Sequence, residues 1–328
     1  MPYASICAVE YYLPEHVLTN AHLAAEFPDW GADKISEKTG IQARHIAGKS
    51  EFSSDLAARA AQKLFASGVA KPSEIDYVLF CTQTPDFALP TSACLLQHRL
   101  GIPTTAGALD FNLGCSGYVY GLSLAKGLLE TGQARNVLLL TGETYSKLMD
   151  PQDKSVRTIF GDAGAATLVT LDERADTERI GPFVLGSDGA GGPNLVCSRG
   201  GFRGALAEAE GRTALWMNGP EIFNFTLKVV PDVVNRVLAR AGLDSSSVDL
   251  FVFHQANRYM LDHLRRKMNV PAEKFMMALE NCGNTVSCTI PIALAEAKSQ
   301  GRLKTGDRVL LVGFGVGYSW GAALLHWQ

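Results

Sequence analysis

The segment SEIDYVLF at residues 73–80 decides the fold, because it recurs as SSVDLFVF at residues 246–253. A second apolar run follows each copy at a similar distance, NVLLL at residues 136–140 and RVLLV at residues 308–312. Continuous apolar runs of this kind are typical of strands buried on both faces of a sheet. The recurrence favours a duplicated α/β unit, although unrelated strand–helix–strand units also share such a pattern.

Strand and helix patterns alternate through the rest of the chain. We expect strands at residues 76–82, 107–112, 136–142 and 164–170, and again at 249–254, 274–280, 308–314 and 321–327. Helical periodicity predicts helices over residues 54–68, 91–100, 116–132, 220–241, 257–268 and 287–300, the first of them capped near Asp55. This alternation predicts a layered α/β architecture.

The composition narrows the class of protein. The 328 residues are 47% hydrophobic and carry a net charge of −3, which excludes a disordered chain and gives no general footprint for nucleic acid. No apolar run is long enough to span a membrane, and no secretory signal is visible. The seven cysteines are scattered without metal-ligand spacing. We therefore expect a cytoplasmic globular protein with free thiols, no metal, and neither a nucleic-acid nor a membrane partner.

A cysteine stands where a predicted strand turns into a helix, in the sequence DFNLGCSGY at residues 110–118. At this position the macrodipole and the free N–H groups of the helix would stabilise the Cys115 thiolate. The neighbouring glycines permit close approach of another backbone segment. A small buried thiol that packs the turn is the alternative interpretation.

Two further polar side chains follow apolar strand patterns. His254 ends the run FVFH, and Asn284 lies in the turn-forming sequence NCGNT at residues 281–285. Taken singly, these residues are explained as well by a core histidine and by a plain loop with a helix cap. A thiol, an imidazole and a carboxamide at three strand ends together favour acyl transfer through a thioester.

The glycine-rich segment GFGVGYSWG at residues 313–321 continues into an apolar strand, without the helix and acidic residue of a dinucleotide site. A tight hairpin fits better, and its N–H groups are suitable oxyanion donors.

A basic cluster, Arg258, Arg265, Arg266 and Lys267, follows His254 on one predicted helix. This cluster suits an acidic partner, whereas a solvated helix face is the plainer interpretation.

Together these segments resemble the thiolase-superfamily condensing enzymes, and most closely the β-ketoacyl-acyl carrier protein synthase III family. The resemblance runs over essentially the whole chain. Its motifs are KTGI at 38–41 with RHI at 44–46, LPTSAC at 89–94, GCSG at 114–117, FGDAGA at 160–165, MNG at 217–219, HQAN at 254–257, GNT at 283–285 and WGA at 320–322. It implies a thiolase-like fold in which duplicated βαβαβαββ halves form five α-β-α-β-α layers. Residues 1–172 would carry the cysteine, and residues 173–328 the histidine and the asparagine.

The same resemblance implies the roles of individual residues. Cys115 would be acylated, while His254 and Asn284 would hydrogen-bond the malonyl thioester carbonyl as carbon dioxide leaves. The backbone N–H groups of Cys115 and Val316 would form the oxyanion hole. Substrate and CoA contacts would fall at Lys34, Lys38, Lys154, Arg157, Ile159, Phe160, Met217, Gly219, Phe223, Ala256 and Asn257. Leu89 would gate the acyl pocket at the dimer contact, and Arg258, Arg265, Arg266 and Lys267 would dock the carrier protein.

The sequence departs from the family pattern at the surface that would bind the nucleotide. The adenine-stacking tryptophan falls at Lys34, with Trp30 displaced upstream. A nucleotide-binding arginine falls at Lys154, and Arg157 stands where an apolar residue is usual.

Further departures concern the carrier surface and the hairpin. Tyr259 and Asn224 replace an arginine and a lysine of the carrier-docking surface. Val316 replaces a glycine, and a positive φ would be costly for valine. The catalytic residues are thus retained, whereas the surfaces for donor and carrier are altered.

We therefore predict a homodimeric acyltransferase that needs no cofactor. An acyl-CoA would acylate Cys115, and a malonyl group on an acyl carrier protein would then be decarboxylated and condensed to a β-ketoacyl product. The closest alternative is a related acyltransferase of a specialised pathway that uses another acceptor or CoA thioesters. A cysteine thioester hydrolase and a non-catalytic partner subunit are the more distant alternatives.

Overall fold

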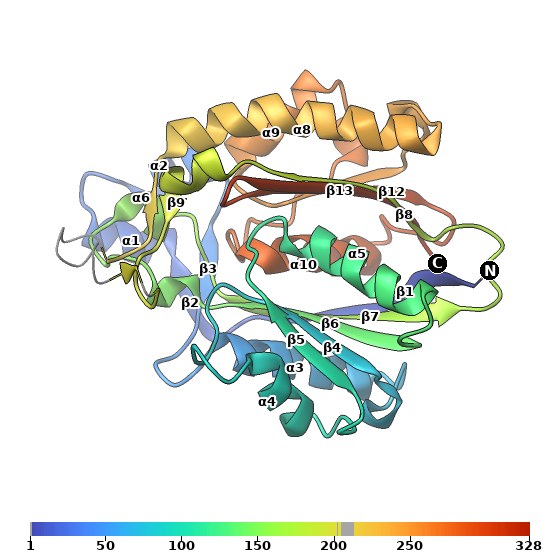
Figure 1. The fold of residues 1–328 in the computed structure, drawn as a ribbon. Coiled ribbons are helices and arrows are strands. Elements are labelled where there is room, and N and C mark those ends of the chain that lie inside the picture. The colour runs from blue at the N-terminus through green and yellow to red at the C-terminus, as the bar shows by residue number, and fades with distance from the viewer. Residues whose placement is uncertain (1, 202, 205–212) are drawn as a thin grey trace.

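The computed structural model describes residues 2–201, 203–204 and 213–328. In this part of the chain, two large sheets alternate with three layers of helices (Figure 1). One outer layer holds α3 (Ser53–Ala66) and α4 (Ser92–Arg99), the middle layer α5 (Gly117–Glu130) and α10 (Thr289–Ser299), and the other outer layer α8 (Gly219–Ala241) and α9 (Arg258–Lys267). The expected five-layered α-β-α-β-α architecture is therefore confirmed.

Within the described residues, the strands form two large sheets and two small pairs. The first sheet has the order β1-β7-β6-β4-β5, and the second has the order β11-β12-β13-β8. Their bounds are β1 (Tyr3–Tyr12), β4 (Tyr77–Cys81), β5 (Gly107–Phe111), β6 (Asn136–Glu143), β7 (Ala163–Asp172), β8 (Ile180–Ser187), β11 (Leu250–Phe253), β12 (Arg308–Gly315) and β13 (Ser319–His326). The small pairs are β2 (His16–Thr19) with β3 (Ala43–Ile46), and β9 (Leu195–Val196) with β10 (Trp216–Met217). The last strand of the first sheet ends at Asp172, and the division at residues 172/173 stays a prediction.

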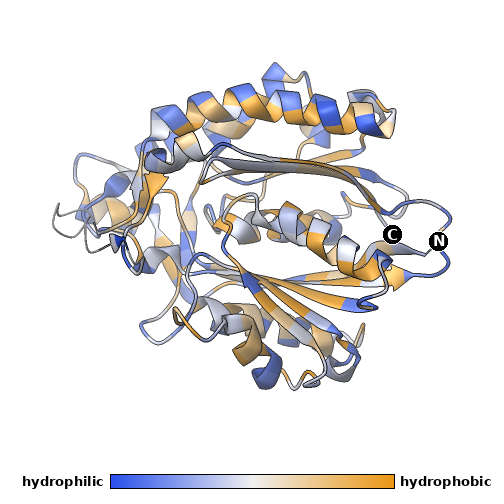
Figure 2. Ribbon diagram, in the orientation of Figure 1, coloured by the Kyte–Doolittle hydropathy of each residue, from blue (hydrophilic) through white to orange (hydrophobic). Residues whose placement is uncertain are grey.

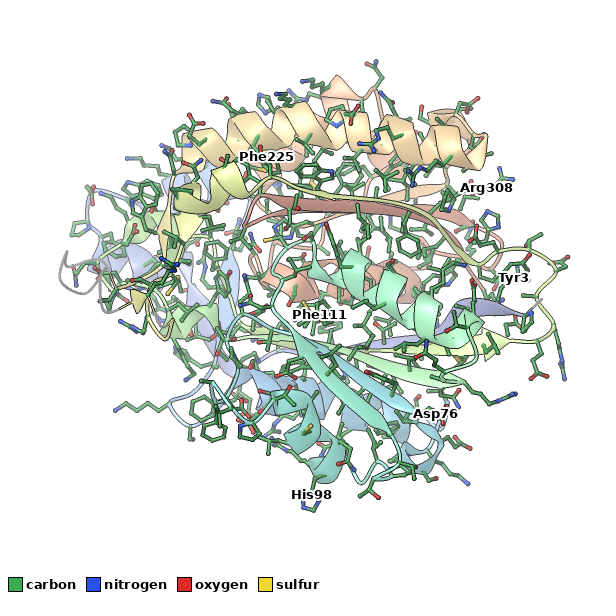
Figure 3. All side chains as sticks on the ribbon, viewed as in Figure 1. Tyr3, Asp76, His98, Phe111, Phe225 and Arg308 are labelled. Atoms are coloured by element: carbon green, nitrogen blue, oxygen red, sulfur yellow. The ribbon has the colours of Figure 1, made fainter. Side chains whose placement is uncertain are left out.

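The predicted repeat is visible in matching hydrogen bonds at one end of the two sheets. The N–H of Asp76 donates to the Asn136 carbonyl at 3.0 Å, and the Asp76 carboxylate accepts the N–H of Asn136 at 2.9 Å. Asp249 makes the same two bonds to Arg308, each at 2.9 Å. Each aspartate thereby joins a pair of parallel strands, and Figure 3 shows Asp76 and Arg308 at the same end of the molecule. The equivalent geometry supports duplication of one α/β unit.

The core consists of apolar side chains from the sheets and the helices between them. Figure 2 shows apolar residues concentrated in the strands of the first sheet and alternating with polar residues along α8. In the middle layer, α5 buries Val119 and Leu122, and α10 buries Ile290 and Leu294, all without exposed surface. A helix enclosed by two sheets buries more of its circumference than a helix with one face in water.

One predicted strand is wrong. A short 3₁₀ turn (Ala272–Lys274) reaches the start of residues 274–280, where the structure has a single bridge between Phe251 and Phe275 in place of a ladder. The side chain of Gln255 replaces the ladder, because its amide accepts the N–H of Ala278 at 2.8 Å and donates to the Met276 carbonyl at 3.3 Å. The apolar pattern of this segment reflects burial, not strand pairing.

Other elements differ from the expectations in their position or were not predicted. Helix α3 begins at Ser53, and the Asp55 carboxylate caps it by accepting the N–H of Phe52 at 2.7 Å. The sequence patterns did not predict the edge strands β1 and β8, nor the helices α1 (Asn20–Glu26), α2 (Ala32–Thr39) and α6 (Lys154–Arg157). None of the described helices is long and apolar enough to cross a membrane.

Gly164 of β7 gives a test of the packing between the first sheet and α3. A Cβ at this position would lie 2.2–2.4 Å from the backbone of Leu56 and Ala57. We expect Gly164→Ala to destabilise the protein by roughly 1–3 kcal/mol through overpacking, measured as a lower thermal unfolding midpoint. The control is Gly127→Ala, where a Cβ in α5 would meet nothing within 4 Å. Its midpoint should stay the same or rise, and equal midpoints for both variants would contradict the packing argument.

Candidate active site

Cys115 lies in the turn between β5 and α5, and only 6% of its surface is exposed. Strand β12 passes directly over this turn. A Cβ at Gly315 would lie 2.8 Å from the Cys115 Cβ and 2.9 Å from its Sγ. Glycine is therefore required in β12 for the strand and the cysteine to approach this closely.

Burial governs the charge state of the Cys115 thiol. It raises the pKa to about 12, and the Glu143 carboxylate adds to the rise. Hydrogen bonds from the N–H groups of Val316 and Cys115 act in the opposite direction. The sequence predicts stabilisation of the thiolate at the start of a helix, whereas in the structure desolvation outweighs this effect.

His254 follows β11 and is held on two sides. Its N–H donates to the Val312 carbonyl of β12 at 2.8 Å. On the ring, Nδ1 lies 2.8 Å from the Thr289 hydroxyl, which itself donates to the Val286 carbonyl at 2.9 Å. The hydroxyl therefore accepts from Nδ1–H, and Nε2 keeps its lone pair. Burial lowers the pKa of His254 to about 3, so the imidazole is neutral.

Asn284 completes the group of polar side chains. Its Nδ2 lies 3.4 Å from Nε2 of His254, and its Oδ1 accepts the N–H of Val286 at 2.9 Å. The backbone of Asn284 also bonds to the segment after α6, with its N–H donating to the Ile159 carbonyl at 2.9 Å. Val286 has a φ of 56°, a strained value for a buried β-branched residue. The turn thus accepts local strain while it orients the carboxamide.

One pocket brings the three side chains together. It is lined by Cys115, Ile159, Phe160, Leu195, Met217, Gly219, Ile222, His254, Ala256, Asn257, Met260, Asn284, Phe314 and Gly315. The lining includes six of the predicted substrate contacts and adds Leu195, Ile222 and Met260, which the motifs did not single out. Ile222 and Met260 occupy apolar positions beside predicted contacts on two helices, so helical periodicity near the motifs is the signal for them.

The hairpin between β12 and β13 is confirmed, and Val316 fits it without the expected strain. Val316 is not among the described residues with positive φ. The Ser319 hydroxyl donates to the Val316 carbonyl at 2.8 Å and lies 2.7 Å from the Ser116 hydroxyl, which joins the hairpin to the cysteine turn. Valine therefore keeps the N–H directed at the thiol.

The predicted nucleotide contacts gather around Trp30, outside the pocket lining. The ammonium groups of Lys34, Lys38 and Lys154 lie 5.4, 5.2 and 5.8 Å from the centre of the Trp30 ring. Within this cluster Lys154 pairs with Asp29, and nearby Arg157 pairs with Glu26. The displaced tryptophan thus lies beside the predicted cations, although two of the cations already have carboxylate partners.

The predicted carrier-docking residues differ in whether their charged groups already have partners within the protein. Arg258 pairs with Glu280 at 3.4 Å, and Arg265 pairs with Asp262 at 3.6 Å. Lys267 donates to the Leu227 carbonyl at 2.7 Å, while Arg266 is exposed.

The two remaining predicted residues lie outside the pocket lining. Phe223 stacks on Tyr259 with ring centres 5.6 Å apart. Leu89 is 81% exposed on the loop after β4.

The layered fold and the buried cysteine, histidine and asparagine define a thiolase-like acyltransferase. Two family models match the chain, 3-oxoacyl-[acyl-carrier-protein (ACP)] synthase III over residues 109–189 and its C-terminal domain over residues 238–327. The chain belongs to the 3-oxoacyl-[acyl-carrier-protein] synthase III family, whose members are condensing enzymes.

Individual relatives match this chain over nearly its full length. The beta-ketoacyl-[acyl-carrier-protein] synthase III of Caldanaerobacter subterraneus is 36% identical, over 99% of this chain and 98% of the relative. A crystal structure of a 3-oxoacyl-(acyl-carrier-protein) synthase III is 55% identical with a TM-score of 0.96, covering 99% of this chain and all of the other. The priming β-ketosynthase of the R1128 polyketide pathway is 29% identical with a TM-score of 0.92, over 99% of this chain and 96% of the other.

A pair of pocket glycines tests the close approach of β12 to Cys115. We expect Gly315→Ala to slow alkylation of Cys115 by iodoacetamide by at least about tenfold, because the new methyl group would lie only 2.9 Å from the sulfur and crowd it. Gly219→Ala is the control, since a Cβ there would meet nothing within 4 Å although Gly219 also lines the pocket. Peptide mapping of the alkylated cysteine gives the rates, and equal rates would show that Gly315 does not shape the site.

Proposed function

We propose that this enzyme takes an acyl group from acyl-CoA onto Cys115 and condenses it with a malonyl group carried by an acyl carrier protein, releasing carbon dioxide and CoA. The observation that carries the proposal is the meeting of a thiol, a neutral imidazole and a carboxamide in one pocket, with backbone N–H groups directed at the sulfur. Thioester chemistry needs such a nucleophile and oxyanion donors.

In the first step the Cys115 sulfur attacks the thioester carbonyl, and the bond to the CoA sulfur breaks. The N–H groups of Cys115 and Val316 stabilise the oxyanion that forms. The thiol proton leaves with the CoA sulfur, and Nε2 of His254 is a neutral base that can carry it. The products are acyl-Cys115 and free CoA.

In the second step the malonyl thioester enters along the apolar pocket wall. Loss of carbon dioxide leaves an enolate whose oxygen needs hydrogen-bond donors. The Asn284 amide supplies one donor, and His254 supplies the other when Nε2 carries a proton. The nucleophilic carbon attacks acyl-Cys115, and the C–S bond breaks to release the β-ketoacyl product and the Cys115 thiolate. The thiolate takes up one proton from water, by way of Nε2 of His254, and the free thiol is restored.

The cluster at Trp30 supports a binding role toward the CoA nucleotide. An indole ring offers a stacking surface for adenine, and the lysines around it attract phosphate. Lys34, Lys38, Lys154 and Arg157 are the proposed contacts, and Asp29 and Glu26 would have to release two of them.

The edge of the first sheet supports a homodimer. β5 is an edge strand, and its Leu109 is 44% exposed. On the adjoining loop, Phe87 is 59% and Leu89 is 81% exposed. An unprotected edge strand flanked by exposed apolar side chains is suited to pairing with a second copy of the chain, and Leu89 would then reach the partner's acyl pocket.

The second candidate is an acyltransferase of a specialised pathway that uses another acceptor or CoA thioesters. It is favoured by the carrier surface, where Tyr259 and Asn224 are uncharged and Arg258 and Arg265 already have acidic partners.

Intact-mass analysis with a panel of acyl-CoAs, followed by malonyl donors, tests the proposed reaction. Cys115→Ala should form no acyl adduct, whereas Cys282→Ala, which removes another buried thiol, should form it normally. Asn284→Ala should still be acylated but release carbon dioxide on the order of 10²- to 10³-fold more slowly, because one oriented donor is lost. An adduct on another cysteine, or acylation without a condensed product from any malonyl donor, would refute the proposal.

Charge reversal on α9 tests the carrier surface. We expect Arg258→Glu with Arg266→Glu to raise KM for carrier-bound malonate severalfold, and the effect should weaken with salt while acyl-CoA acylation stays unchanged. Arg135→Glu is the control, because Arg135 is an exposed cation of the first half that pairs with Glu173. If malonyl-CoA serves as well as the carrier-bound form and the reversal changes neither, the second candidate is correct.

A further inference from the structure

Glu143, the last residue of β6, is fully buried, and the proposed reaction does not use it. Its carboxylate accepts the N–H of Gln83 at 3.1 and 3.3 Å and the hydroxyls of Thr84 at 3.3 Å and Ser287 at 2.8 Å. Each of these donors is neutral. A buried carboxylate without a bonded cation is costly to a fold, so its contacts call for a functional explanation.

These donors come from both sides of the active site. Gln83 and Thr84 follow β4 in the half of the chain that carries Cys115. Ser287 lies in the turn at residues 284–289, two of whose other members orient the candidate catalytic side chains. Val286 holds the Asn284 carboxamide, and Thr289 holds the His254 ring. The carboxylate therefore bridges the turn and the opposite half of the chain.

We propose that Glu143 is a positioning residue that holds this turn, through Ser287, in register with Cys115. The inference rests on the proposed function, because it assigns the turn to the decarboxylation step and Cys115 to the acylation step.

The charge of Glu143 has a second effect, on the thiol. The carboxylate raises the pKa of Cys115, while burial raises its own pKa to about 8 against the hydrogen bonds from Ser287, Gln83 and Thr84. The other titratable groups that interact with it are Cys81, Cys288, Tyr145 and Asp162. Above pH 8, where Glu143 is charged, a neutral side chain at this position would make the Cys115 thiolate easier to form while it weakened the bridge. The two half-reactions should then change in opposite directions.

Ser287→Ala tests the bridge, because it removes one hydroxyl and leaves Glu143 its bonds to Gln83 and Thr84. We expect kcat for the condensation to fall on the order of 10- to 100-fold, with KM for the malonyl donor and the rate of Cys115 acylation unchanged. Ser287→Thr keeps the hydroxyl and should restore kcat. Thr167→Val is the matched control. It removes the buried Thr167 hydroxyl, which lies 3.1 Å from the Tyr118 hydroxyl, and both residues are outside the turn.

Glu143→Gln tests the effect of the Glu143 charge on the Cys115 thiol. Alkylation of Cys115 by iodoacetamide at pH 9, where Glu143 is charged, should become faster while condensation becomes slower, a pattern that general loss of structure does not produce. Wild-type kcat in Ser287→Ala, or an equal fall of both half-reactions in Ser287→Ala and Glu143→Gln, would overturn the inference alone. If the wild-type enzyme neither acylates Cys115 nor releases carbon dioxide in the same assays, the proposed function fails and the inference fails with it.

Discussion

The active site depends on the direct contact between the backbone of β12 and the turn that carries Cys115. A Cβ at Gly313 would lie 2.7 Å from the Ser116 Cα, and one at Gly315 would lie 2.9 Å from the Cys115 sulfur. The same strand accepts the N–H of His254 at Val312 and leads into the hairpin that carries Val316. One strand of the second half therefore sets the distances among the thiol, the imidazole and an oxyanion donor, and only glycine allows it to do so.

This packing also explains the electrostatics of the site. Because the two halves meet so closely, the groups at the contact lose most of their water. The thiol and the carboxyl of Glu143 have raised pKa values, and the imidazole has a lowered one. All three shifts favour the neutral form, as desolvation requires. In such surroundings a few oriented N–H and amide donors have a larger effect on a developing negative charge than they would have in water.

The surface around Trp30 is organised differently from the buried active site. Ion pairs and cation–π contacts around Trp30 involve exposed and half-buried side chains, and such contacts contribute little to stability. These contacts can rearrange for a ligand at a small cost in free energy. Substitutions on this surface are therefore tolerated, whereas the buried active site stays constrained. This contrast fits a sequence that keeps the candidate catalytic residues Cys115, His254 and Asn284 and departs from the family resemblance at its surface.

The sequence by itself determined the layered α/β architecture, the repeat and the three catalytic candidates, because buried strands and strand-to-helix turns impose local residue patterns. The six predicted helices lie within a few residues of α3, α4, α5, α8, α9 and α10. The edge strands β1 and β8 carry weaker patterns, and the segment at 274–280 is apolar because it is buried, with Gln255 replacing a strand partner. Only the tertiary structure decided which side chains Glu143 joins, how Thr289 orients His254, and that Trp30 meets Lys154. These contacts join residues far apart in the chain, and their geometry follows from how the layers pack, which no local pattern records.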